Sequence, residues 1–132
     1  MKRTVEAGKT LLVDGPASVI LDTGVADILG APVQAASRIV IREGKRFPFE
    51  IREKAEFDLM LGEKAAVDEA PGSTIPKTWE DAADTILELK SLPVIVMIVG
   101  GIDSGKTSFS AYLANKGLKV KRSVAMIDAD LG

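Results

Sequence analysis

Hydrophobic and polar side chains alternate with a period of two along the first half of the chain. Between Thr10 and about Ala70, short alternating runs are broken by turn residues, which is the pattern of antiparallel strands. Phe47, Phe49 and Ile51 share one face of such a run, while their neighbours are mostly charged. The pattern predicts a small all-β domain, a sandwich or partial barrel of about six to eight strands. Turns are expected at Asp14–Pro16, Thr23–Gly24, Gly30–Pro32, Glu43–Lys45 and Gly62–Glu63.

A linker separates this region from a segment with helical periodicity. Residues 71–77 contain two prolines and a Gly-Ser pair, which interrupt both strands and helices. Thr78 is the expected N-cap of the following helix, and Lys90, Ser91 and Pro93 are expected to end it. The apolar stripe of this helix comprises Trp79, Ala82, Ala83, Ile86 and Leu87.

The last third of the chain has the pattern of an α/β protein. The run from Val94 to Val99 is apolar and rich in β-branched residues, as in a parallel strand covered on both faces. A glycine-rich segment and a helix follow, and the helix is expected to stop at Gly117, with Leu118 closing a Schellman motif. A second buried strand is predicted at about Val124 to Ile127. This order predicts the first βαβ unit of a doubly wound sheet.

The glycine-rich segment from Gly100 to Thr107 matches the Walker A pattern G-x-x-x-x-G-K-[ST] in full. Glycines allow consecutive backbone N–H groups to turn inward around a phosphate. Lys106 is suited to the β- and γ-phosphates of ATP or another NTP, and the Thr107 hydroxyl to Mg²⁺. A glycine-rich turn that matches by accident would lack the flanking strand and helix. The expected cofactor-binding residues are Gly100, Gly101, Ile102, Asp103, Ser104, Gly105, Lys106, Thr107 and Ser108.

Together these patterns predict a P-loop NTPase core, of the α/β class, preceded by an all-β domain. The expected parts are residues 1–70 (β-rich domain), 71–92 (linker and amphipathic helix) and 93–132 (P-loop domain). A P-loop domain needs several parallel strands, whereas the last part offers two in about 40 residues, the lower limit for independent folding. We therefore interpret the P-loop domain as truncated.

Two acidic residues follow the second predicted strand. Asp128 and Asp130 lie at its carboxyl end, where ligands of such sheets collect. If that strand neighbours the phosphate loop, one carboxylate would hold Mg²⁺ and the other would accept a proton from an attacking hydroxyl. The alternative interpretation is a pair of solvated loop acids.

Composition limits the remaining chemistry. The chain has no Cys and no His, so disulfides, thiolate nucleophiles and imidazole chemistry are excluded. A net charge of −2 gives no global attraction to nucleic acid, and no apolar stretch is long enough to span a bilayer, so we expect a cytoplasmic protein. Trp79 and Tyr112 are interpreted as core side chains. A basic run is interpreted mainly as a solvated helix end, and it comprises Lys116, Lys119, Lys121 and Arg122.

Three segments together resemble the polynucleotide 5′-hydroxyl kinases: Gly72–Trp79, Val99–Thr107 and Ile127–Gly132. The short form here is similar to the archaeal members, which are related to the kinase subunit of the mRNA cleavage and polyadenylation factor and to the rRNA-processing kinase. The resemblance implies transfer of the γ-phosphate of ATP, or another NTP, to the 5′-hydroxyl of RNA or DNA. It assigns Lys106 to the transferring phosphate, Thr107 to Mg²⁺ and Asp130 to the catalytic base, with Asp128 near the metal.

The family's later elements do not occur in these 132 residues. They are a glutamine after the Asp-x-Asp-x-Gly motif, an aromatic clamp for the nucleic acid and an arginine-bearing lid. We therefore expect the chain alone to lack kinase activity and to bind ATP weakly. Three alternatives stay open: a nucleotide-binding scaffold of an RNA-processing complex, a P-loop GTPase or metallochaperone, and an interaction module formed by the β domain.

Overall fold

The computed structural model describes residues 1–129, and the chain divides into two compact units. The first unit is Met1–Thr74 and the second is Ile75–Gly132. The division falls inside the predicted linker, where the glycine, serine and proline residues end the last strand before the first helix begins. Neither described helix is long and apolar enough to cross a membrane.

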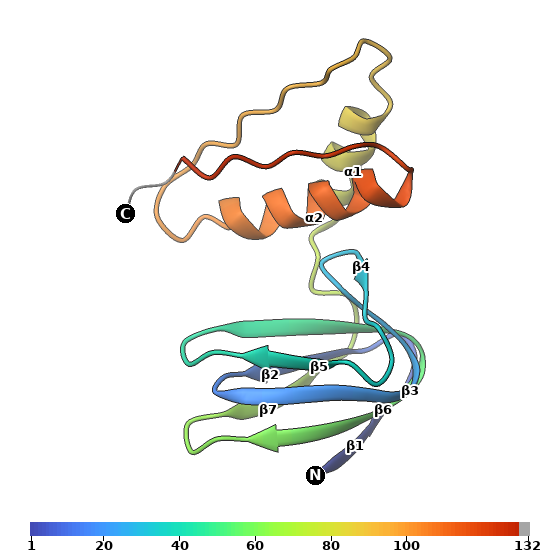
Figure 1. The fold of residues 1–132 in the computed structure, drawn as a ribbon, viewed down its shortest axis with the longest axis vertical. Coiled ribbons are helices and arrows are strands. Elements are labelled where there is room, and N and C mark those ends of the chain that lie inside the picture. Colours follow the sequence, from blue (N-terminus) through green and yellow to red (C-terminus); the bar gives the residue numbers. More distant parts are fainter. Residues whose placement is uncertain (130–132) are drawn as a thin grey trace. The chain divides into compact units, whose positions relative to one another are not determined.

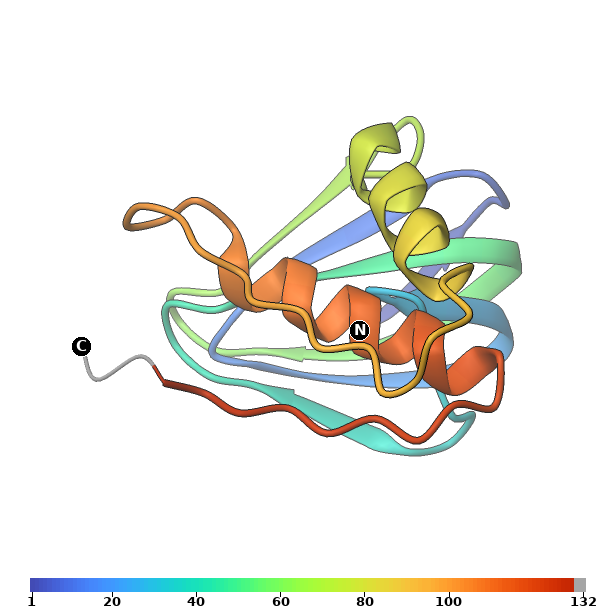
Figure 2. The ribbon, with the colours of Figure 1, turned by 90° about the horizontal axis from the view of Figure 1, so that it is seen from above.

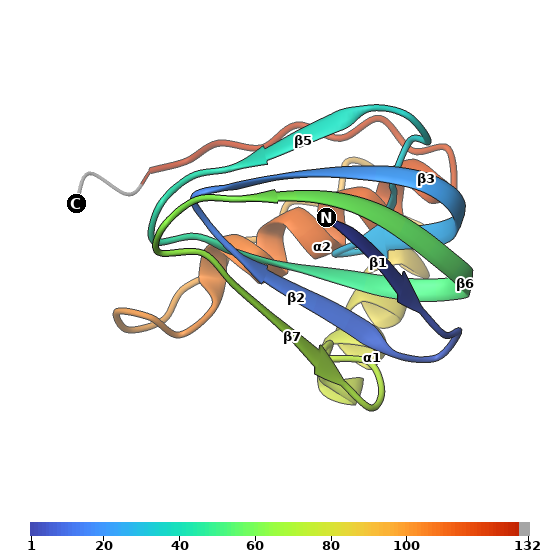
Figure 3. The ribbon, with the colours of Figure 1, turned by 90° about the horizontal axis from the view of Figure 1, so that it is seen from below.

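The first unit is one continuous antiparallel sheet of seven strands (Figures 1 and 3). The longest strand, β6, pairs with β2 over its first residues, and with β3 and β1 farther along. The outer strands are β4 and β5, which pair with β3, and β7, which pairs with β2. The predicted all-β region is thus present as a single hydrogen-bonded sheet. The strands are β1 (Lys2–Val5), β2 (Thr10–Asp14), β3 (Ala17–Ile28), β4 (Ala31–Pro32), β5 (Arg38–Ile41), β6 (Arg46–Leu61) and β7 (Ala66–Ala70).

The sheet curls around an apolar core because alternate side chains of its strands point to the same side. Phe49 and Phe57 are fully buried and meet edge to face, with ring centroids 5.6 Å apart. The alternation predicted for this region matches the structure with two exceptions: Leu61 at the end of β6 is 39% exposed, and Glu50 is buried. The core comprises Val5, Leu11, Val13, Ala17, Val19, Leu21, Ala26, Ile41, Phe49, Ile51, Ala55, Phe57 and Leu59.

The turn predicted at Thr23–Gly24 is wrong, because β3 continues through these residues. The register between β3 and β6 shifts there, as in a β-bulge. Gly24 has a φ of +90°, and a Cβ on it would lie 2.2 Å from the carbonyl oxygen of Lys54 on β6. Glycine therefore serves here to bend a paired strand. The expected turns at Asp14–Pro16, Glu43–Lys45 and Gly62–Glu63 lie between successive strands. The turn expected at Gly30–Pro32 is confirmed only at Gly30, because Ala31 and Pro32 form β4.

Buried polar side chains in this unit have partners. The Thr10 hydroxyl donates to the carbonyl oxygen of Gly72 at 2.6 Å, and the Arg52 guanidinium donates to Asp27 at 2.9 Å. Glu50, which the alternation predicts on the polar face, is buried and accepts a hydrogen bond from Ser73 at 2.9 Å. Within the described residues, no buried side-chain nitrogen or oxygen lacks a partner. The sheet therefore buries its apolar side chains and gives its buried polar side chains hydrogen-bond partners.

The second unit contains two helices, α1 (Lys77–Leu87) and α2 (Lys106–Lys119), shown in Figures 1 and 2. Helix α1 begins earlier than predicted: its N-cap is Pro76, and Thr78 lies inside the helix. The extended backbone of Pro76 lets its carbonyl oxygen accept hydrogen bonds from the N–H groups of Trp79 and Glu80, so the helix needs no side-chain cap.

Helix α2 continues past Gly117, where the sequence predicted its end. The expected Schellman motif forms four residues later, around Lys121, whose φ is +60°. The Arg122 N–H donates to the carbonyl oxygen of Gly117, and the Lys121 N–H donates to that of Leu118, both at 3.0 Å. Gly117 itself is buried, and a Cβ there would lie 3.1 Å from Val124. Gly117 therefore lies inside the helix, packed beside Val124, and does not end it.

The two segments that flank α2 are extended but do not form strands in residues 1–129. Both residues 94–99 and residues 124–127 run along α2 toward its N-terminal end, as Figures 1 and 2 show from two directions. Neither pairs with another strand of the described chain, so the predicted βαβ unit has its loop and helix without a hydrogen-bonded sheet. A strand needs a lateral partner for its backbone groups, and each of these segments lacks one there.

Candidate functional site

The segment Gly100–Thr107 forms a loop that leads directly into α2. Gly105 is the N-cap of the helix and has left-handed backbone angles, with φ 83° and ψ 15°. Asp103 also has a positive φ, 56°. Residues of left-handed conformation turn successive N–H groups toward one side, and this turning makes a concave anion-binding backbone. Of the three loop glycines, Gly105 is the one with a positive φ, so the conformation expected of the loop glycines occurs at the N-cap of α2.

Side chains of the loop bind its own carbonyl oxygens. The Lys106 ammonium donates to the carbonyl oxygens of Gly100 at 2.9 Å and Gly101 at 2.6 Å. The Ser104 hydroxyl donates to the Gly101 carbonyl oxygen at 2.8 Å. These bonds fold the lysine back across the loop, which places its positive charge over the backbone cradle. A Cβ on Gly100 would lie 2.5 Å from the Ser104 hydroxyl oxygen, so this closed arrangement requires glycine at that position.

The residues at the start of α2 fit an anion. The first turn of a helix presents N–H groups that have no intrahelical acceptor, together with the positive end of the helix dipole. No acidic residue occupies the first turn of α2, whereas Lys116 and Lys119 lie in its last turn. Together with Lys106, these features make a donor set suited to phosphate.

Of the groups expected to bind Mg²⁺, the Thr107 hydroxyl lies at this end of the helix. Thr107 and Ser108 are exposed in the first turn of α2. Asp128 is exposed in the extended segment that follows α2, and Asp130 lies outside the described residues. Among the described residues, no three acidic side chains are grouped closely enough to hold a metal ion by themselves.

Tyr112 is buried, as the sequence predicts, whereas Trp79 is only half-buried. The Trp79 ring meets Phe109 edge to face, with centroids 5.3 Å apart, and lies 6.3 Å from the ring of Tyr112. Tyr112 is 3% exposed. These rings join α1 to the first half of α2, so they stabilise the region beside the phosphate loop. The Trp79 ring also lies beside the loop at Gly105, and no pattern in the sequence predicts this proximity.

The basic run is more than a solvated helix end. The Lys116 ammonium lies 3.3 Å from the Asp84 carboxylate on α1. The Arg122 guanidinium donates to the carbonyl oxygens of Leu87 and Leu89, so it caps the C-terminus of α1. The sequence interpretation is therefore wrong for these two residues, which hold the helices together. Exposed side chains at Lys119 and Lys121 agree with it.

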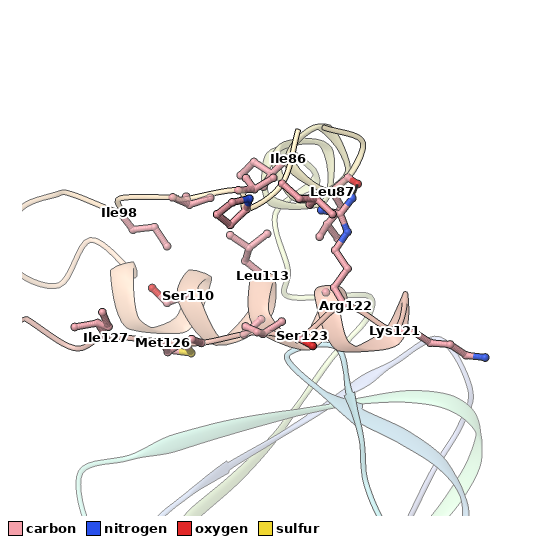
Figure 4. A pocket seen from close by; sticks show the side chains of 18 residues that line it. Ile86, Leu87, Ile98, Ser110, Leu113, Lys121, Arg122, Ser123, Met126 and Ile127 are labelled. Atoms are coloured by element: carbon pink, nitrogen blue, oxygen red, sulfur yellow. Dashed lines mark hydrogen bonds between the residues drawn. The ribbon is translucent and has the colours of Figure 1, made fainter. Parts of the chain in front are cut away.

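An apolar groove of about 840 Å³ lies between the two extended segments, over α2 (Figure 4). Figure 4 shows Ile98 from the first segment, Met126 and Ile127 from the second and Leu113 from the helix around it. No residue of the phosphate loop lines this groove. The groove is therefore the uncovered apolar side of the unit, separate from the candidate phosphate site.

Comparison with curated proteins finds relatives named polyribonucleotide 5′-hydroxyl-kinase. The proteins of Pyrococcus furiosus and Methanocaldococcus jannaschii are 41% and 42% identical to this chain over 58 residues. A polynucleotide 5′-hydroxyl-kinase of Arabidopsis thaliana is 36% identical over 58 residues. Each match covers 44% of this chain and 16% of the relative, so the chain matches only about a sixth of those proteins. These names confirm the predicted resemblance.

Two solved structures have a similar fold. A complex of Clp1p with Pcf11p aligns with a TM-score of 0.69 and 20% identity, over 92% of this chain and 30% of the other. A second structure, on the extended Pcf11p–Clp1p interface and ATP loss in a glycine-to-arginine mutant, gives a TM-score of 0.70, 20% identity and 92% and 31% coverage. No family model matches the sequence. The structural likeness shows that the two units have a known fold.

Proposed function

We propose that this chain, which is related in sequence to the polynucleotide 5′-hydroxyl kinases, supplies the phosphate-binding loop of an enzyme of that activity. The reaction is transfer of the γ-phosphoryl group of ATP, or another NTP, to the 5′-hydroxyl oxygen of RNA or DNA. The bond between the γ-phosphorus and the bridging oxygen breaks, and the nucleoside diphosphate (ADP from ATP) leaves. A new bond forms to the 5′ oxygen, whose proton passes to a base.

The observation that carries this proposal is the loop at the start of α2. Its backbone turns around Gly105, Lys106 lies across it, and no acidic side chain opposes an anion in the first helical turn. Each of these features favours a polyphosphate, and the curated relatives carry the name of the reaction. The loop alone fits many nucleotide-using proteins, so sequence similarity selects the kinase among them.

Within this proposal each residue has a defined task. The N–H groups of residues 100–108 bind the β- and γ-phosphates, and Lys106 moves from its carbonyl partners to the γ-phosphate, where charge develops during transfer. The Thr107 hydroxyl, with Asp128, would hold Mg²⁺, whose charge would neutralise the phosphates. Asp130 accepts the proton of the 5′-hydroxyl.

Substitution of Lys106 tests the proposal. In the natural full-length protein, Lys106→Ala should lower phosphorylation of a 5′-hydroxyl oligonucleotide by about a hundredfold or more, because one charged donor to the transition state is lost. The measurement is transfer of label from γ-labelled ATP. Lys119→Ala is the matched control: it removes an exposed lysine from the opposite end of the same helix and should leave the rate unchanged.

Two outcomes would contradict the proposal. Equal phosphorylation by the parent and Lys106→Ala would exclude the loop from the reaction. An unmodified protein that binds ATP but phosphorylates neither RNA nor DNA would favour the alternative function, a nucleotide-binding scaffold. Clp1p, whose fold is similar, is solved in complex with Pcf11p, so the same samples should also be assayed for assembly with partner proteins.

A further inference from the structure

One residue of α1 touches the phosphate loop from outside. The Trp79 ring atoms Cζ2 and Cη2 lie 3.2 Å and 3.5 Å from the position that a Cβ of Gly105 would occupy. Gly105 is the N-cap of α2 and immediately precedes Lys106. The indole therefore forms a wall against the last flexible residue of the loop.

The ring is itself held in place by α2. Phe109 meets it edge to face at 5.3 Å, and Tyr112 lies 6.3 Å away, so the first two turns of the helix fix its orientation. The Phe109 N–H in turn donates to the Gly105 carbonyl oxygen at 2.9 Å. Gly105, Phe109 and Trp79 thus form a closed set of contacts in which the loop, the helix and α1 meet.

A second glycine of the loop lacks such a wall. Nothing lies within 4 Å of a Cβ built on Gly101, while the hydrogen bonds of Ser104 and Lys106 join the loop only to itself. Glycine has more backbone freedom than any other residue, so a loop of this composition loses binding energy whenever it leaves the phosphate-binding conformation. The Trp79 ring lies against Gly105, where it restricts the backbone freedom of that glycine.

We propose that Trp79 is a positioning residue for the phosphate loop. It keeps Gly105 in the left-handed conformation, and the N–H groups of the first turn of α2 and the Lys106 side chain then point at the bound phosphates. This inference rests on the proposed function, because it assigns Trp79 to the same nucleotide site. It touches no substrate and acts through Gly105.

Three variants of the natural full-length protein test it by calorimetric titration with ATP and Mg²⁺. Trp79→Ala should weaken ATP binding by about tenfold to a hundredfold, because the loop loses its preset geometry. Trp79→Phe should largely restore the affinity, since a phenyl ring still lies against the loop. Leu87→Ala is the control: it loosens the packing of α1 on α2 beside Gly117, far along the helix from the loop, and should keep the affinity of the parent.

Fluorescence gives a readout that packing alone would not change. Trp79 is the sole tryptophan of these 132 residues, and its ring touches the loop, so ATP should alter a tryptophan signal that is missing in Trp79→Phe. The inference is overturned if ATP leaves that signal unchanged. Equal loss of affinity in Leu87→Ala and Trp79→Ala, or unchanged affinity in Trp79→Ala, would overturn it too.

Lys106→Ala separates this inference from the proposed function. If Lys106→Ala abolishes transfer while Trp79→Ala binds ATP as tightly as the parent, the kinase assignment stands and the positioning role fails. If neither Lys106→Ala nor Trp79→Ala changes transfer or ATP binding, both fail. The expected result is loss of transfer in Lys106→Ala and weaker ATP binding, restored by Trp79→Phe, at position 79.

Discussion

The two units differ in how much of their apolar surface they enclose. The first unit surrounds a core of fully buried side chains, including Phe49 and Phe57. The described part of the second unit buries only Ala83 and Tyr112 among its hydrophobic residues, while Ile95 is 89% exposed and Ile127 is 94% exposed. The sheet is therefore held by its own core. The phosphate loop is held by local hydrogen bonds and by the contact between two helices.

This difference predicts opposite responses to substitution. In a closed core, the loss of a side chain or the addition of a methyl group lowers the free energy of unfolding, because the surrounding side chains have no room to adjust. A partly exposed helix pair absorbs the same change by a shift of its surface segments. The following predictions test that contrast, from the largest expected effect to the smallest.

Truncation of a core aromatic in the sheet should have the largest effect. Phe57→Ala should lower the free energy of unfolding by about 3–5 kcal/mol, because it leaves a cavity beside Phe49 in a fully enclosed site. Denaturant unfolding measures the change. Met60→Ala, on the same strand but 59% exposed, is the control and should change stability by less than about 0.5 kcal/mol. Similar losses in both variants would contradict the closed core.

The bulge in β3 should be the next most sensitive position. Gly24→Ala should destabilise the sheet by about 2–3 kcal/mol, since alanine at a φ of +90° is strained and its Cβ would collide with the Lys54 carbonyl oxygen. Gly8→Ala is matched for strain, with a φ of +84°, but nothing lies within 4 Å of its Cβ. It should cost about 1 kcal/mol. Equal losses in thermal unfolding would show that the close approach to Lys54 has no energetic consequence.

Features set by neighbouring residues in the chain were predictable. The alternation around Phe49 and Phe57 depends on the period of a strand, and the loop depends on glycines at fixed positions beside Lys106. Both are local rules, so the sequence alone predicts the all-β region and the loop that leads into α2. Such rules depend only on residues that are close in the sequence.

Features set by distant residues were not predictable. Gly24 looks like a turn residue, but pairing with β6 carries the strand through it. Gly117 looks like a helix end, but its missing side chain makes room for Val124, and the helix closes at Lys121 instead. In each case the missing side chain of glycine leaves space for another segment that packs closely against it. The wall that Trp79 forms against Gly105 is of the same kind.

Filling the glycine within α2 tests the tolerance of the second unit. Gly117→Ala should stabilise this unit by about 0.5–1 kcal/mol, because alanine favours helix over glycine. Its Cβ would lie 3.1 Å from Val124, which is 41% exposed on an unpaired segment and has room to move. Hydrogen exchange of the α2 amides measures the change. Ala111→Gly should show the reverse effect, and destabilisation by Gly117→Ala would mean that this segment is as rigid as the sheet.

Low pH should have the smallest effect, and it should lower the stability of the sheet. Arg46 holds the pKa of the Asp14 carboxyl below its ordinary value of 3.8, and Arg3 with Lys9 lowers that of Glu69; both carboxyls lie in the sheet. A lowered folded pKa adds stability above the unfolded pKa, and this stability is lost as pH falls through the folded value. The protection of the β2 and β7 amides against hydrogen exchange, relative to the intrinsic rate at each pH, should therefore fall below about pH 4. Arg46→Gln should weaken this dependence, whereas Arg38→Gln, an exposed control on β5, should keep it. An unchanged profile in Arg46→Gln would show that the Asp14 pair, which is open to solvent, contributes no stability.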